Sequence, residues 1–266
     1  MRVIGHRGNS SVAPQNTLAA FESACAAGVD AVELDVQLTA DGYPVVIHDD
    51  EVDATTDGTG RVDGLTLAQV RALDAGSWFA PAYAGQRVPV PAEVVDLLVR
   101  HPAVELLLEL KGVWTADQVR LLLGPLEAAA LLDRVVGQSF EAASVAALRD
   151  AAPRLRRGLL VEELPVGSDG SADLPALDRL CADLGVMTCN PDGRLLQDHP
   201  ELVSRQHGAG RQVMAWTLDE PWMWDAAGSL AVDAVITNRP DRLLGWLAGG
   251  RAPGVASAPR TGTEER

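Results

Sequence analysis

The stretch "VELDVQLTADGYPVVIHDD", residues 32–50, carries acidic side chains where a packed strand would carry apolar ones. Glu33 and Asp35 alternate with aliphatic residues, which is the pattern of a strand with two different faces. The same stretch ends near an imidazole, that of His48. Burial of carboxylates costs free energy unless partners compensate for it, so the pattern indicates a functional site built on a strand.

The Asp-Gly pair at 41–42 is typical of a tight hairpin turn. Too few residues separate the flanking apolar runs for a crossover between parallel strands. We therefore expect residues 44–48 to form a strand antiparallel to residues 30–38. With the Asp-Gly pair as the two central turn residues, Asp35 lies opposite His48, and the acidic face and the imidazole come together.

Short apolar runs alternate with amphipathic stretches along most of the chain. We expect strands at 2–5, 30–38, 44–48, 104–110, 134–139, 156–161, 185–190, 211–217 and 232–237, and helices near 16–28, 91–100, 115–131, 141–151, 173–184, 198–208, 219–228 and 239–248. Such alternation indicates parallel strands joined by right-handed crossovers. With the hairpin strand set apart, the remaining strands suffice to close a (β/α)8 barrel of the TIM type.

The chain of 266 residues has the length of one such barrel. We expect a single domain over 1–248, with residues 51–90 as a small insertion over the barrel rim that contains one short helix near 66–74. Residues 249–266 are rich in Gly, Pro and Ala without periodicity, which predicts a disordered tail.

Net charge and cysteine content narrow the kinds of binding partner and the cellular compartment that we expect for this protein. The formal charge of −15 argues against nucleic acid and anionic membranes as partners. No apolar run is long enough to span a bilayer, and the N-terminus lacks the apolar core of a signal peptide. The 3 cysteines form no CxxC pair, which is typical of reduced thiols and predicts a cytoplasmic protein. The sequence does not indicate an oligomeric state.

The carboxyl ends of parallel strands meet at one rim of a barrel, where this fold places its active sites. The polar residues that we expect to meet there are Glu33, Asp35, Glu109, His6, His48, Arg7 and Lys111. Carboxylates that converge without a counter-charge repel one another, and a divalent cation with all-oxygen ligands, Mg²⁺ or Ca²⁺, would relieve that repulsion. The two histidines suit general acid and base catalysis, while Arg7 and Lys111 indicate a small phosphate-type substrate.

Residues 5–50, which begin "GHRGN" and contain "PQNT", "ELDV" and "IHDD", resemble the glycerophosphodiester phosphodiesterase family. The family pattern is His-Arg-Gly, then Pro-Glu-Asn-Thr, then Glu-x-Asp-Val, and a His-Asp after the Asp-Gly turn. Further matches follow in order: "TTDGTG" at 55–60, "LLLELK" at 106–111, "QSF" at 138–140, "AWT" at 215–217 and "VDAVITNRPDRL" at 232–243. The resemblance covers nearly all of the chain before the tail.

The resemblance implies a TIM-type barrel that cleaves glycerophosphodiesters to glycerol phosphate and an alcohol through a cyclic phosphate. By position it implies His6 and His48 as the acid and base, Glu33, Asp35 and Glu109 as metal ligands, and Arg7 and Lys111 as phosphate contacts. It also implies Trp216 as a wall of the substrate site and residues 51–90 as a small insertion over that site. The preferred alcohol and the choice between Mg²⁺ and Ca²⁺ stay open.

Two residues depart from the family pattern. Gln15 stands where the family usually has Glu, and Ala54 stands where an Arg commonly precedes Thr-Thr. These departures leave room for a barrel that binds a phosphate ligand without turnover. A glycosidase that uses Glu33 and Glu109 as a carboxylate pair is a second alternative, but it leaves the histidines and cations without a role.

Overall fold

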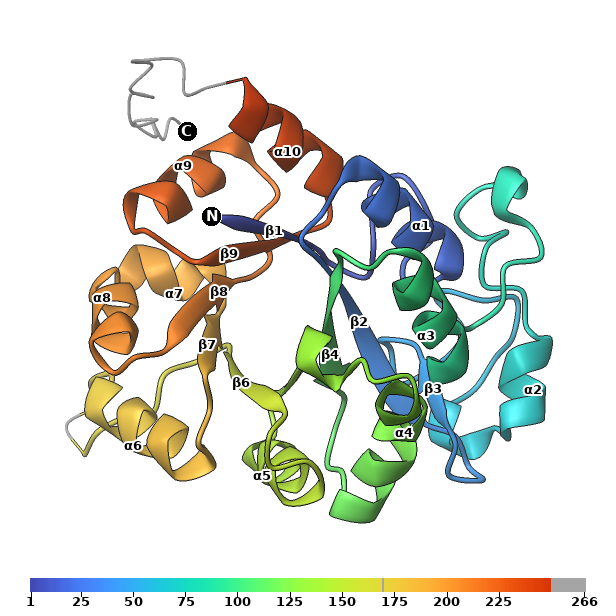
Figure 1. Cartoon of the computed structure of the whole chain (residues 1–266), viewed down its shortest axis with the longest axis horizontal. Coiled ribbons are helices and arrows are strands. Elements are labelled where there is room, and N and C mark those ends of the chain that lie inside the picture. The colour runs from blue at the N-terminus through green and yellow to red at the C-terminus, as the bar shows by residue number, and fades with distance from the viewer. Residues whose placement is uncertain (169, 250–266) are drawn as a thin grey trace, which may run out of the picture.

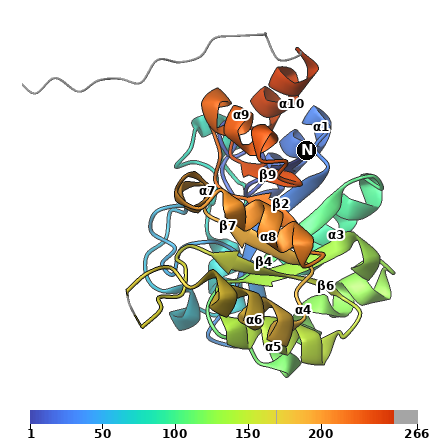
Figure 2. The ribbon, with the colours of Figure 1, turned by 90° about the vertical axis from the view of Figure 1, so that its left-hand side faces the viewer.

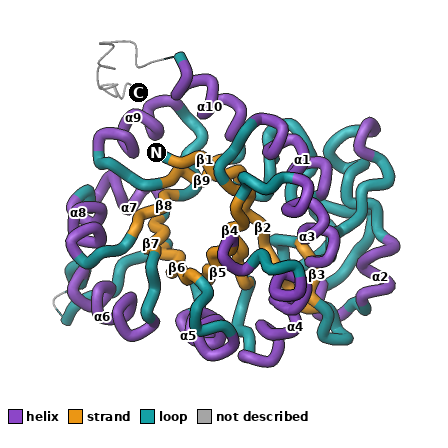
Figure 3. Tube along the Cα trace, viewed as in Figure 1, coloured by secondary structure: helices purple, strands orange, loops and turns teal. Residues whose placement is uncertain are grey.

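The structure is a computed structural model that describes residues 1–168 and 170–249. In these ranges, eight parallel strands form a closed barrel in which β1 pairs with both β9 and β2 (Figures 1 and 3). The barrel strands are β1 (Arg2–Gly5), β2 (Ala31–Leu38), β4 (Glu105–Leu110), β5 (Val135–Ser139), β6 (Arg156–Val161), β7 (Thr188–Pro191), β8 (Gln212–Ala215) and β9 (Ala234–Thr237). The predicted TIM-type barrel is therefore confirmed. The tail expected at 249–266 lies outside the described residues, apart from Gly249.

Helices cover the outer surface of the barrel, and most of them follow the strand-helix alternation (Figures 2 and 3). They are α1 (Leu18–Ala27), α3 (Pro91–Arg100), α4 (Ala116–Ala128), α5 (Ala142–Ala151), α6 (Leu174–Leu184), α7 (Gly193–Asp198), α8 (Glu201–Gly208), α9 (Pro221–Ser229) and α10 (Pro240–Ala248), with a 3-10 turn, η3 (Leu132–Arg134), before β5. Nowhere in the described ranges does a helix combine the length and apolar character needed to cross a membrane.

Two apolar layers stabilise the barrel. The inner layer fills the barrel with Ile4, Ala31, Leu107, Val136, Met214, Ala234 and Ile236, and Trp216 packs against it. The outer layer is larger and lies between the strands and the helices, where Phe21, Leu97 and Leu148 are fully buried. Removal of this apolar area from water stabilises the closed barrel, so the polar residues at its carboxyl end rest on a rigid base.

The hairpin after β2 is confirmed, but its predicted register is wrong. Strand β3 (Pro44–Val46) runs antiparallel to β2, with Val36 opposite Val46. The turn contains one residue more than expected, because Gly42 adopts a left-handed conformation (φ 81°) after two other loop residues. Asp35 consequently faces Ile47, whose backbone N–H donates to its carbonyl at 3.0 Å, and His48 lies beyond the end of the strand.

Residues 51–90 form a small layer outside β3, at the edge of the barrel (Figure 1). The segment includes α2 (Leu67–Ala72) and the 3-10 turns η1 (Val62–Gly64) and η2 (Pro81–Tyr83). Its apolar side chains Val52, Val62, Val70, Ala75 and Val88 form a separate core together with Val45 and Ile47 of the preceding segment. The insertion is therefore attached to the barrel through β3 and the residue that precedes His48.

Candidate active site

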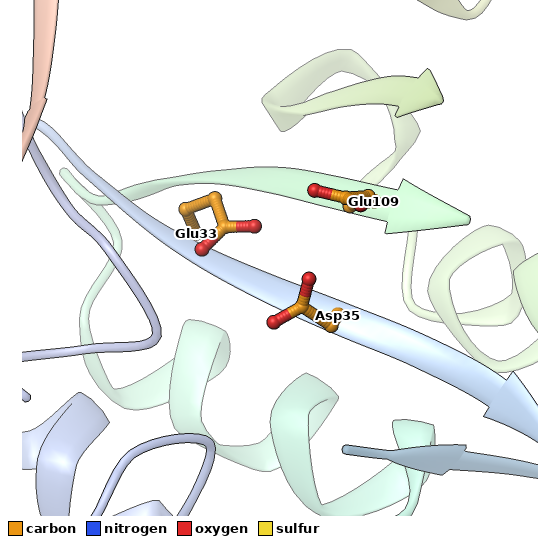
Figure 4. A group of neighbouring side chains, drawn as sticks. All are labelled: Glu33, Asp35 and Glu109. Atoms are coloured by element: carbon orange, nitrogen blue, oxygen red, sulfur yellow. The ribbon is translucent and has the colours of Figure 1, made fainter. Parts of the chain in front are cut away.

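Three buried carboxylates meet on two neighbouring strands. Asp35 on β2 lies opposite Glu109 on β4, and Glu33 lies two residues before Asp35 on the same face. Each of the three offers an oxygen atom within 4.8 Å of the others, and their exposed fractions are 1% for Glu33, 0% for Asp35 and 6% for Glu109. Figure 4 shows the three side chains on the same side of the strands. The predicted acidic cluster is thus present.

Cationic and amide groups contact part of this cluster. The backbone N–H of Arg7 donates to Glu33 Oε2 at 2.9 Å, and the guanidinium Nε of Arg7 lies 3.3 Å from Asp35 Oδ2. Asn16 Nδ2 donates to the same Asp35 oxygen at 2.8 Å. On the other side, Lys111 Nζ lies 2.9 Å from an oxygen of Glu109.

The contacts leave several carboxylate oxygens of the cluster without hydrogen bonds. Glu33 Oε1 and Asp35 Oδ1 are buried and have no hydrogen-bond partner among the described residues. Glu109 Oε1 has only the ion-pair contact with Lys111. Buried acceptors are normally satisfied, and unpaired ones are costly. The two unpaired oxygens, beside the Lys111-paired oxygen of Glu109, form an all-oxygen donor set of the kind that a hard divalent cation takes, so these residues fit a Mg²⁺ or Ca²⁺ ion.

The pKa values of the acids show the cost of this cluster without a cation. Burial, together with the charges of Asp35 and Glu109, raises the pKa of Glu33 well above its usual value. Burial and the charge of Asp35 raise the pKa of Glu109 to about 7. Burial also acts against ionisation of Asp35, but Arg7 and the other nearby cations outweigh it and lower the pKa of Asp35. Glu33 and Glu109 would therefore bind a cation in exchange for protons.

His6 follows β1 and lies next to the end of β9. Its backbone N–H donates to the carbonyl of Thr237 at 2.8 Å, and its Nδ1 lies 2.8 Å from Oδ1 of Asn238. Desolvation by burial, followed by the positive charge of Arg7, lowers the pKa of His6 to about 4. The ring is therefore neutral near pH 7 and able to accept a proton.

His48 reaches the site from an irregular segment after β3. Gln37 fixes that segment, since its Nε2 lies 2.7 Å from the carbonyl oxygens of both His48 and Asp49. The ring Nδ1 of His48 lies 2.6 Å from Oδ1 of Asp49. Gln37 lies on the same face of β2 as Glu33 and Asp35. The sequence predicted that His48 pairs with β2 as part of a strand, but hydrogen bonds from the Gln37 side chain hold this segment instead.

The predicted residues surround one cavity of about 90 Å³ at the carboxyl ends of the strands. Its lining consists of His6, Arg7, Glu33, His48, Glu109, Lys111, Gln138, Phe140, Leu160, Trp216, Thr217 and Ile236. Asp35 is absent from the lining but belongs to the carboxylate cluster beside it. The structure thus brings together all eight residues that the sequence singled out.

An aromatic pair forms one side of the cavity. The rings of Phe140 and Trp216 meet edge to face, with centroids 5.4 Å apart, and Lys111 Nζ lies 5.8 Å from the centre of the Phe140 ring. Trp216 Nε1 donates to the carbonyl of Asn190 at 2.7 Å, which fixes the indole. Phe140 was not singled out from the sequence, although it belongs to the "QSF" match.

The two departures from the family pattern lie in different surroundings. Gln15 accepts a hydrogen bond at 2.7 Å from Nη1 of Arg7, so an amide oxygen holds the guanidinium without adding a fourth carboxylate. Ala54 is exposed in the insertion. Asn16, next to Gln15, was also missed as a site residue, although "PQNT" contains it and it contacts Asp35 through both its amide nitrogen and its amide oxygen.

Comparison with known proteins identifies the family. A model of the "Glycerophosphoryl diester phosphodiesterase family" matches residues 6–242. The YhdW protein of Bacillus subtilis (strain 168) is 34% identical over 248 residues, which cover 92% of this chain and 97% of that protein. A glycerophosphodiester phosphodiesterase of Caldanaerobacter subterraneus subsp. tengcongensis is 32% identical over 249 residues, covering 93% of this chain and 98% of that enzyme.

A solved structure of another phosphodiesterase supports the same family assignment. A phosphodiesterase of Oleispira antarctica, in complex with the product sn-glycerol-3-phosphate, superposes with a TM-score of 0.78 at 26% identity and covers 93% of this chain and 97% of its own. Fold and sequence thus agree along almost the full length of the described chain. This chain belongs to the glycerophosphoryl diester phosphodiesterase family and is a phosphoric diester hydrolase.

Proposed function

We propose that the enzyme hydrolyses glycerophosphodiesters to glycerol phosphate and an alcohol, and that it requires one divalent cation, Mg²⁺ or Ca²⁺. The observation that carries the proposal is the group of buried carboxylate oxygens without hydrogen-bond partners, in contact with the cavity that His6 and His48 line. The product bound by the Oleispira antarctica relative, sn-glycerol-3-phosphate, supports the same substrate class.

Glu33, Asp35 and Glu109 would hold the cation, which would supply positive charge to stabilise the phosphate oxygens as the reaction proceeds. Arg7 and Lys111 bring two further positive groups to the same cavity. Both already contact carboxylates, so they are fixed in place before a substrate binds. We infer that they orient the phosphodiester and share its negative charge.

His6 and His48 are the proposed acid and base. One imidazole removes the proton from the 2-hydroxyl of glycerol as that oxygen attacks phosphorus, and the other protonates the departing alcohol oxygen. In the second step a water molecule opens the cyclic phosphate, and the two histidines exchange roles, so that both return to their starting states. Trp216 and Phe140 would form the apolar wall against which the glycerol or the departing alcohol packs.

The proposal is tested with a panel of glycerophosphodiesters that carry choline, ethanolamine, inositol or glycerol, each assayed with Mg²⁺, with Ca²⁺ and with a chelator. We expect release of both glycerol phosphate and the alcohol, with activity lost on chelation and restored by one of the two ions. Cleavage that continues unchanged in the chelator would rule out the metal requirement. Binding of the diesters without product release would favour the non-catalytic alternative.

The stability of the metal-free enzyme should depend on pH because of the buried acids. The folded state raises the pKa of Glu109 from 4.5 to about 7, so it retains a proton that the unfolded chain has lost. The contribution of Glu109 to the free energy of unfolding should therefore fall as the pH rises from 4.5 to about 7, whereas that of His6, whose pKa is lowered from 6.5 to about 4, rises over a similar range. The difference between the melting curves with and without the cation isolates the effect of the acids. Thermal melting across this range, with and without Mg²⁺, measures the effect. We expect the cation to raise the melting temperature more at the upper end of the range, and an equal rise at all pH values would contradict the model.

A further inference from the structure

His6 has a neighbour whose role neither the acid-base proposal nor the metal site explains. Asn238 directly follows β9, and His6 directly follows β1, which pairs with β9 so that Gly5 lies opposite Thr237. The end of the strand pair therefore places the two side chains together. The amide oxygen Oδ1 of Asn238 lies 2.8 Å from Nδ1 of the His6 ring.

A carboxylate determines which end of the amide faces the histidine. Asp219, between β8 and α9, accepts a hydrogen bond from Asn238 Nδ2 at 2.7 Å and another from the Asn238 backbone N–H at 2.8 Å. The hydroxyl of Thr237 donates to the same carboxylate at 2.8 Å. An ionised carboxylate can only accept hydrogen bonds, so the NH2 group of Asn238 must face Asp219 and its oxygen must face His6.

The orientation of the amide in turn determines the tautomer of the ring. An amide oxygen cannot donate a hydrogen bond, so the Nδ1 atom of His6 must carry a hydrogen. In a neutral imidazole the other nitrogen, Nε2, then has a free lone pair. Because Nδ1 is occupied by Asn238, Nε2 is the ring nitrogen left for the cavity that His6 lines.

His48 shows a different arrangement in the same cavity. Its Nδ1 faces the carboxylate of Asp49, the next residue along the chain, at 2.6 Å. A carboxylate can balance the charge of an imidazolium, as in other acid-base sites, whereas a neutral amide orients a ring without balancing its charge. The partner of His6 is therefore suited to holding one tautomer in place.

We propose that Asn238, oriented by Asp219, is a positioning residue that keeps His6 in the Nδ1-protonated tautomer and presents its unprotonated Nε2 to the substrate. The inference rests on the proposed role of His6 as an acid or base. It assigns to Asp219 an indirect role, since this residue acts on His6 only through Asn238.

The test measures the tautomer directly. Ring-nitrogen chemical shifts are recorded at neutral pH on histidine-labelled enzyme in excess Mg²⁺, and the His6 signals are assigned with a His6→Gln variant. We expect Nδ1 protonated in the parent enzyme and a mixture of tautomers in Asn238→Ala. In that variant kcat should fall about 10- to 100-fold, by analogy with the loss of partners that orient metal-ligating histidines, while KM and the Mg²⁺-induced rise in melting temperature change little.

A double exchange provides the rescue. In Asp219→Asn with Asn238→Asp, the amide at 219 can donate to the carboxylate at 238, and the carboxylate still accepts from His6 Nδ1. This double variant should again place a hydrogen on Nδ1 and recover more activity than Asn238→Ala, although the new carboxylate also favours the charged ring. It also provides a test if Asn238→Ala fails to fold. As a matched control, Asp233→Asn alters the contact of Asp233 with His207 at the start of β9 and should leave the His6 signals and kcat unchanged.

The outcomes separate this inference from the proposed function. A parent enzyme with Nε2 protonated, or an Asn238→Ala variant with an unchanged tautomer, would overturn the inference even if its activity fell. A changed tautomer with an unchanged rate would uphold the positioning of the ring and count against a catalytic role for His6.

Discussion

Replacement of His48 by Ala is expected to lower kcat about 10²- to 10⁴-fold, the usual contribution of a positioned acid or base. The ring lines the cavity, and its Nδ1 lies 2.6 Å from Oδ1 of Asp49, which is not one of the three carboxylates of the cluster. Its loss should therefore leave the fold and the carboxylate cluster intact. Steady-state kinetics on one diester, with a melting curve for each variant, provide the measurement, and His6→Ala should show a loss of the same order.

The matched control for this prediction is His207→Gln. His207 also pairs with a carboxylate, that of Asp233, at 2.8 Å, but it lies at the end of the barrel opposite the site. We expect this variant to retain the parent kcat. A His48→Ala enzyme that keeps most of its rate would remove His48 from the acid-base pair.

Replacement of Glu109 by Gln should abolish metal binding without weakening the metal-free fold. Since the buried carboxyl of Glu109 has a pKa raised to about 7, a neutral amide of the same shape removes an unfavourable buried charge at higher pH. We expect the metal-free variant to melt no lower than the parent at alkaline pH. Its kcat should fall about 10³-fold, since a metal ion supplies several kcal/mol of charge stabilisation.

Glu105→Gln is the matched control on the same strand. Glu105 begins β4 and pairs with Arg2 at 3.0 Å and with Arg156 at 3.2 Å, away from the cavity. This variant should lose at most about 1 kcal/mol of stability, as is usual for partly exposed ion pairs. It should also retain the Mg²⁺-induced rise in melting temperature. Equal loss of that rise in both variants would contradict the assignment of Glu109 as a ligand.

The hydrophobic pattern was sufficient to predict the barrel because each strand alternates with a helix of the right length. Its boundaries were less accurate. The strand expected at 185–190 begins instead at Thr188, because Gly185 ends α6 in a left-handed conformation. Helix α7 was missed, since its sequence begins with Gly193 directly after a Pro-Asp pair and spans only 6 residues.

The charged residues of the site could also be predicted, because the carboxyl ends of parallel strands must converge. The side-chain amides that orient the site could not be predicted. Gln37 and Asn238 each make two or more hydrogen bonds through their side-chain amides, and those contacts depend on loop conformations that no periodicity encodes. The hairpin shows most clearly what the sequence could not predict. One additional loop residue at Gly42 changes which residue faces Asp35, but His48 still lines the cavity.

The insertion is coupled through β3 to one of the two histidines of the site. Val45 and Ile47 pack into the core of residues 51–90, whereas Val46 between them packs into the barrel. His48 thus directly follows a residue that packs into the core of the insertion, whereas Glu33, Asp35 and Glu109 lie on β2 and β4. A substitution in the insertion that moves Ile47 should therefore shift the imidazole of His48 relative to the leaving group and leave the three carboxylates in place.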